Sequence, residues 1–124
     1  MICLDTNYLV CSLVPGTHEA AAMARWLQRG ENLFAPSVAW YEFLCGPVTP
    51  DEIRLVRSLL KGGLIPFEDA HAAAAAKLFN ATGRIRRLRL DAMIAASAMV
   101  AGCRLATSNI ADFKVFVPFG LTLV

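Results

Sequence analysis

Short apolar runs alternate with segments of helical character along the whole chain. The runs cover residues 2–4, 33–35, 64–67 and 104–106, and a last one covers 121–124. Strands that alternate with helices favour a mostly parallel sheet with both faces covered. Pro66 cannot donate a hydrogen bond to a neighbouring strand, so we expect its strand to lie at an edge or to end there. With 124 residues, the pattern predicts a single α/β domain spanning residues 1–124.

The expected helices are bounded by start and stop signals. The clearest signal is Thr49-Pro50-Asp51-Glu52, a capping box with proline at the first helical position. A helix that begins at Asp91 is apolar on nearly every side until Gly102, which predicts that it is buried. The other helices are expected directly after residue 5, at 20–27, from 36 to about 46, from 69 to about 83, and at 109–113.

The composition predicts a large core and some apolar surface. Hydrophobic residues make up 56% of the chain, which excludes disorder and leads us to expect a homodimer or a protein partner. The longest apolar stretch, 92–103, is shorter than the about 20 residues that span a membrane. The first residues lack the features of a secretory signal, so we expect a cytoplasmic protein with no membrane association. The net charge of +2 is too small to identify a nucleic-acid partner.

Four acidic residues stand far apart in the sequence, at positions that βα units turn toward one end of a sheet. They are Asp5, Glu42, Asp91 and Asp112. Asp5 follows the first strand and Asp112 follows the fourth, while Asp91 begins the buried helix. Because functional groups gather beyond the carboxyl ends of parallel strands, we expect the four carboxylates to face the same end.

Three of these acids also have a purely structural interpretation. Asp5 and Asp91 can cap helices, and Asp112 can be the far half of a capping pair with Asn109. Glu42 has no such role, because its neighbours are apolar or aromatic. Two carboxylates about 4 Å apart repel by about 4 kcal/mol at an effective dielectric of about 20. A cluster of four is therefore expected to bind Mg²⁺ or Mn²⁺, which can hold a phosphodiester and activate a water.

The motifs around these acids, taken in order, resemble those of the PIN domain. They are DTN at residues 5–7, Glu42 followed by Gly46, DxxIAAxA at 91–98, and TxNxxDF at 107–113. The resemblance covers essentially the whole chain. It is strongest to the small stand-alone members that serve as VapC-type toxins of type II toxin–antitoxin pairs. Each motif is short, so the specificity lies in finding all four in the right order.

This resemblance implies a three-layer α/β/α sandwich with a central, mostly parallel sheet. It also implies an endoribonuclease that uses Mg²⁺ or Mn²⁺ and metal-activated water to hydrolyse RNA, that forms a homodimer, and that a cognate antitoxin silences. The implied catalytic and metal-binding residues are Asp5, Glu42, Asp91 and Asp112, with Thr6, Asn7 and Asn109 as polar support. Two positions depart from the pattern. Asn109 stands where some relatives carry a carboxylate, and Ser108 stands where many carry an arginine.

A run of arginines directly precedes Asp91. It consists of Arg84, Arg86, Arg87 and Arg89. If Asp91 belongs to the site, these side chains lie at or near its rim, where they can bind RNA phosphates or an acidic segment of an antitoxin. The sequence leaves both interpretations open, beside that of a solvated connector.

Two other functions fit parts of the pattern. A receiver-like phosphoacceptor has a similar length and a doubly wound sheet, but no lysine follows the last strand and Glu42 would have no role. A PIN-fold module that binds RNA or protein without cutting is the second alternative. Retention of all four acids argues against it, because a binding module gains nothing from their repulsion.

Overall fold

A four-stranded, all-parallel sheet forms the centre of the computed structural model, which describes residues 1–124. The strands are β1 (Ile2–Leu4), β2 (Leu33–Pro36), β3 (Gly63–Ile65) and β4 (Arg104–Ala106), in the spatial order β3-β2-β1-β4. Cys3 of β1 pairs with Phe34 on one side and with Leu105 on the other. Every residue of β1 is buried, which explains why its sequence is an uninterrupted apolar run.

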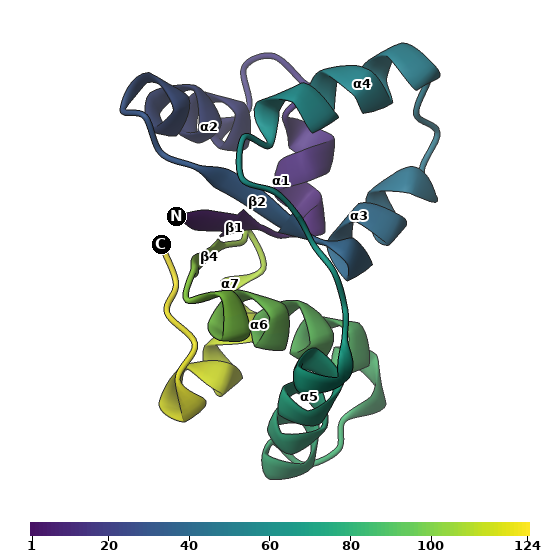
Figure 1. Cartoon of the computed structure of the whole chain (residues 1–124), viewed down its shortest axis with the longest axis vertical. Helices are drawn as coiled ribbons and strands as arrows, with labels where there is room; N and C mark the ends of the chain where they lie inside the picture. The colour runs from purple at the N-terminus through teal and green to yellow at the C-terminus, as the bar shows by residue number, and fades with distance from the viewer.

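Helices cover both faces of the sheet, as the predicted three-layer α/β/α sandwich requires. Figure 1 shows α1 (Thr6–Cys11), α2 (His18–Gln28) and α4 (Pro50–Leu59) on one side, with α5 (Asp69–Ala81) and α6 (Arg89–Ala101) on the other. The helix α3 (Ser37–Leu44) contacts both α1 and α6. The remaining elements are the 3₁₀ helix η1 (Arg86–Leu88), α7 (Ile110–Phe113) and the 3₁₀ helix η2 (Lys114–Phe119).

The start and stop signals of the sequence act where they were expected. Thr49 and Glu52 form a reciprocal capping box at the start of α4. Gly102 ends α6 in the left-handed conformation, with a φ of 69°, which a glycine adopts without steric cost. The helix α6 begins two residues before the predicted Asp91, so that acid lies in the first turn rather than at the cap.

Small side chains make α6 the buried helix of the fold. Six of its residues are buried, and four of these are alanines: Ala92, Ile94, Ala95, Ala96, Ser97 and Ala98. Its close packing against α5, another alanine-rich helix, brings the start of α6 to the same end of the sheet as Asp5. No helix of the structure is both long enough and apolar enough to cross a bilayer.

The prediction of a strand at 121–124 was wrong. Only one bridge forms there, between Leu105 and Leu123, and η2 reaches Phe119, just before this segment. Pro118, which lacks a backbone N–H, and the left-handed Gly120, with a φ of 115°, interrupt the extended conformation before Leu121. The strand containing Pro66 was expected at an edge, and β3 is an edge strand that ends at Ile65, before the proline.

Candidate active site

Asp5 is the most deeply buried of the four acids, and protein donors hold both of its oxygens. It follows the central strand β1 and caps α1, where its Oδ1 accepts a hydrogen bond from the backbone N–H of Thr6 at 2.7 Å. The hydroxyl of Thr107, directly after β4, donates to Oδ2 at 2.7 Å. Burial raises the pKa of Asp5, and these two hydrogen bonds oppose the rise. Asp5 therefore caps a helix, as its structural interpretation predicted. The cap also fixes the orientation of this carboxylate.

Glu42 reaches the same region from α3. The hydroxyl of Thr6 donates a hydrogen bond of 2.8 Å to its Oε1. Thr6 thus bridges two of the acids, since its backbone holds Asp5 while its side chain holds Glu42. Asn7, the other residue of the DTN motif, is exposed and contributes no side-chain hydrogen bond to this arrangement.

Asp91 differs from the other three because its carboxylate makes no hydrogen bond with the protein. It is half-buried in the first turn of α6. Burial and the charges of Asp5, Asp112 and Glu42 raise its pKa from 3.8 to about 6. Each of the other acids therefore lies within electrostatic range of Asp91, whose negative charge the protein leaves without a hydrogen-bond donor.

Asp112 is held from both sides. Arg87 Nη1 lies 2.7 Å from its Oδ1, and the Asn109 side-chain amide donates to Oδ2 at 2.8 Å. These contacts lower the pKa of Asp112, with the arginine making the larger contribution. The backbone N–H of Asn109 in turn donates to the Thr107 hydroxyl at 3.0 Å. A continuous chain of hydrogen bonds thus joins Asp112 to Asp5.

The residues Arg84 to Arg89, which we call the arginine segment, connect α5 to α6. Its backbone begins with a left-handed turn, with a φ of 94° at Gly83 and of 55° at Arg84. Arg86, Arg87 and Arg89 line a hollow of about 420 Å³ with two apolar residues, Leu90 and Met93. A second hollow, of about 280 Å³, shares Arg89 and Met93 and is otherwise apolar. Basic and apolar surface therefore adjoin each other, and Arg87 links this surface to the acids.

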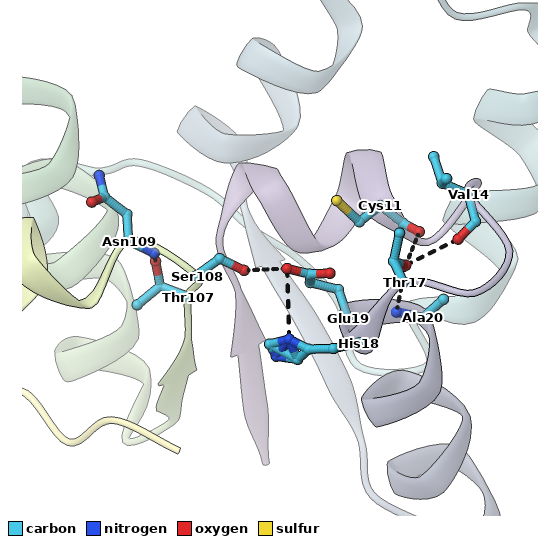
Figure 2. Close-up of polar contacts among 9 residues, drawn as sticks. All are labelled: Cys11, Val14, Thr17, His18, Glu19, Ala20, Thr107, Ser108 and Asn109. Atoms are coloured by element: carbon cyan, nitrogen blue, oxygen red, sulfur yellow. Dashed lines mark hydrogen bonds and ion pairs between the residues drawn. The ribbon is translucent and has the colours of Figure 1, made fainter.

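Ser108 donates a hydrogen bond to a carboxylate that is not one of the four acids. Figure 2 shows its hydroxyl directed at Glu19, at the start of α2, and the His18 ring facing the same carboxylate oxygen. The Ser108 hydroxyl lies 2.7 Å from Glu19 Oε1 and lowers the pKa of Glu19. The loop after β4 is therefore tied to α2. A positive charge at position 108 would meet Glu19. The sequence did not reveal this contact between Ser108 and Glu19.

The four carboxylates have the chemistry to bind a hard divalent cation. Their present positions, however, do not form a complete metal site. All the donors are carboxylate oxygens, which Mg²⁺ and Mn²⁺ prefer, and Asp91 has negative neighbours with no hydrogen-bond donor. However, no three acidic, histidine or cysteine side chains stand close enough together to hold a metal ion. Thr6, Thr107, Asn109 and Arg87 occupy oxygens of the other three acids. Only Arg87 brings a positive charge to these oxygens, so Asp112 is the acid at which a cation meets competition.

Two residues of this region were not expected as site residues from the sequence. Thr107 is buried and links Asp5 to Asn109, yet in the sequence it is only the first letter of a motif. Glu19 follows a helix cap, Thr17, which is explanation enough for an acid in a first helical turn. No local signal distinguishes Glu19 from an ordinary helix-start acid.

Comparisons with known proteins identify the family. The family model described as PIN domain matches residues 2–116. A comparison with curated protein sequences finds no significant match. Among solved structures, the chain is similar to a toxin–antitoxin complex from Klebsiella pneumoniae at 22% identity, covering 91% of this chain and 90% of that one, with a TM-score of 0.66.

Two further structures match over the full length of the chain. VapBC-1 from nontypeable Haemophilus influenzae matches at 19% identity and a TM-score of 0.74, covering 100% of this chain and 97% of that one. VapBC2 from Rickettsia felis, bound to a DNA fragment from its promoter, matches at 21% identity and a TM-score of 0.72, covering 100% and 98%. At these identities the likeness establishes the shared fold.

Proposed function

The chain belongs to the PIN domain family, and we propose that it is a metal-dependent endoribonuclease, the toxin of a type II toxin–antitoxin pair. The observation that carries the proposal is Asp91. Its carboxylate has no hydrogen-bond donor, and three other carboxylates help raise its pKa to about 6. A fold whose only task is binding gains nothing from this repulsion. A site that recruits a divalent cation does, because the cation removes the repulsion.

The residues proposed to hold Mg²⁺ or Mn²⁺ are Asp5, Glu42, Asp91 and Asp112. When bound, such an ion neutralises negative charge on a phosphodiester and lowers the pKa of a water. The protein's part is to keep the carboxylates oriented. Thr6 does this for Asp5 and Glu42, and Thr107, which follows the edge strand β4, does it for Asp5. The Thr6 hydroxyl, after β1, thus orients Glu42. The Thr107 hydroxyl, after β4, orients Asp5.

The arginine segment is proposed to bind the RNA backbone. Arg86 and Arg89 are exposed and line the same hollow as Arg87. Guanidinium groups bind phosphates with two parallel hydrogen bonds, so arginines beside the acids can hold phosphates that flank the scissile bond. Nucleic-acid binding of this kind weakens as salt concentration rises, which separates it from binding by apolar contacts.

The partner is proposed to be an antitoxin with an acidic, amphipathic segment. The hollow of about 280 Å³ offers it Phe67, Phe79 and Met93 beside the charge of Arg89. The solved complexes with the same fold include a toxin–antitoxin pair, which is support by analogy. We also propose a homodimer, since large apolar side chains such as Val100, Val117 and Phe119 are exposed to between 44% and 48%.

The proposal is tested by cleavage of structured RNA and of DNA with Mg²⁺, with Mn²⁺ and with EDTA. We expect RNA cleavage that needs the metal and that Asp91→Asn and Asp5→Asn abolish. Asp69→Asn is the matched control, because Asp69 is an exposed acid in the first turn of α5. Binding of RNA without cleavage in any metal would favour the non-cleaving alternative. Equal cleavage by wild type and both variants, free of contaminating nuclease, would refute the assignment.

A further inference from the structure

We propose that Arg87 is a built-in competitor of the metal ion at Asp112, an inference that rests on the proposed metal-dependent function. Its guanidinium lies 2.7 Å from Asp112 Oδ1 and occupies the position in which a cation would bind that oxygen. The Asn109 amide occupies the other oxygen at 2.8 Å. The protein's own donors thus contact both oxygens of this acid, and a metal ion that binds Oδ1 competes with the positive guanidinium for the same negative charge.

The exposure of the two partners makes this exchange feasible. The Asp112 side chain is only 25% exposed, whereas that of Arg87 is 67% exposed. The acid is thus held as part of α7 and by the hydrogen bond from Asn109, while the arginine can swing into solvent without breaking any packing of the core. Because exposed ion pairs contribute little to stability, the contact can be replaced by a stronger cation at small cost.

Among the arginines of this segment, only Arg87 pairs with an acid. Arg84 donates to the side chain of Asn80 at 3.1 Å. Arg86 and Arg89 make no ion pair, although they line the same hollow. The negative charge of Asp91 also acts on Arg87, so its guanidinium faces two of the four acids. General basicity of the segment therefore does not account for the contact, because Arg84, Arg86 and Arg89 carry the same charge and pair with no acid.

The competition distinguishes the metal-free state of Asp112 from the state in which it holds a metal ion. In the metal-free protein its carboxylate pairs with Arg87, and no three acidic side chains stand close enough together to hold a metal ion. If a metal ion displaced it from Asp112, the Arg87 side chain would remain attached to η1 beside the site, with its hydrogen-bond donors free. It is then placed to bind a phosphate of the substrate. One arginine thus weakens metal binding in the free protein and becomes a phosphate ligand when the metal is bound.

The test is Mn²⁺ binding measured by calorimetry at pH 7.5, with no RNA present. Arg87→Gln removes the competing charge, and Arg86→Gln is the matched control, with the same charge change in the same hollow. We expect Arg87→Gln to bind Mn²⁺ about two- to fivefold more tightly than Arg86→Gln, as the loss of one exposed charge pair predicts. In an Asp112→Asn background the two arginine variants should bind Mn²⁺ equally, because the contested oxygen is gone.

Each other outcome is decisive. Equal affinity of the two arginine variants with Asp112 intact overturns the competition, and weaker binding by Arg87→Gln shows instead that the arginine orients Asp112 for the metal. Absence of Mn²⁺ binding in every variant overturns both this inference and the metal dependence. If the expected difference in affinity is found but the wild type cuts no RNA, the competition stands and the nuclease function falls.

Discussion

Replacing Asp91 with asparagine should make the metal-free protein more stable at neutral pH. The structural reason is that the folded protein holds this carboxylate among three others without a hydrogen-bond donor, which raises its pKa from 3.8 to about 6. Such a rise corresponds to about 3 kcal/mol, at about 1.36 kcal/mol per unit of pKa. Because the side chain is only half-buried, solvent screening reduces this to about 1–1.5 kcal/mol. The expected increase in melting temperature is about 3–6 °C.

The pH dependence gives the prediction its sign. Between pH 3.8 and about 6 the folded protein keeps a proton on Asp91 that the unfolded chain has released. The contribution of Asp91 to stability therefore falls as the pH rises through this window, and the full penalty is present at pH 7. The asparagine variant and the wild type should thus melt at similar temperatures near pH 3.8 and diverge toward pH 7.

The assay is thermal unfolding in EDTA between pH 4 and pH 8, followed by circular dichroism. Asp69→Asn serves as control, because it removes an acid from the first turn of another helix and so loses the same helix-dipole interaction. Addition of Mn²⁺ should stabilise the wild type and not Asp91→Asn, since the ion binds the folded state through this carboxylate. A melting temperature of Asp91→Asn at or below that of the wild type at pH 7.5 would show that Asp91 is not electrostatically strained.

Three further substitutions test the framework around the site. Thr107→Val should lower the free energy of unfolding by about 1–3 kcal/mol, because it leaves an oxygen of buried Asp5 unpaired. Urea unfolding measures this loss. Thr107→Ser keeps the hydroxyl and should restore most of the stability. Thr49→Ala should lower the free energy of unfolding by about 1 kcal/mol through the lost helix cap. It should leave metal binding unchanged, because none of the four acids lies in α4. A shifted Mn²⁺ affinity would contradict this. Gly62→Ala should cost about 1–3 kcal/mol, since the added Cβ would overlap the ring of Phe34; an unchanged urea midpoint would show that the ring moves freely.

Much of the fold could be predicted because its signals are local. The run Ile2–Leu4 is apolar at every position, which only a strand buried on both faces requires. The capping box at Thr49 marks a helix start in four consecutive residues. The end of the chain could not be predicted in this way. Leu121–Val124 has the composition of a strand, but η2 delivers it to β4 for a single bridge, and that depends on where the preceding residues pack.

Some features of the site could likewise be predicted from the sequence, and others could not. The position of Asp5 follows from its place directly after β1, and that of Asp112 from its place in the segment after β4. The pairing of Asp112 with Arg87, 25 residues earlier, depends on the left-handed turn that ends α5 and on how α6 packs. Glu19 reaches Ser108 across 89 residues, and no spacing in the sequence indicates such a contact. Tertiary hydrogen bonds of this kind are invisible to motif reasoning.

The hydrogen bond between Thr107 and Asp5 joins residues 102 positions apart, and this has a consequence for how the protein is made. When the first three strands have been synthesised, Asp5 and Glu42 already exist, but β4, Thr107 and Asp112 are still to come. The hydrogen bond between Thr107 and Asp5 cannot form before then. For a protein proposed to destroy RNA, translation itself would then keep each growing copy harmless until β4 and the residues after it have been synthesised.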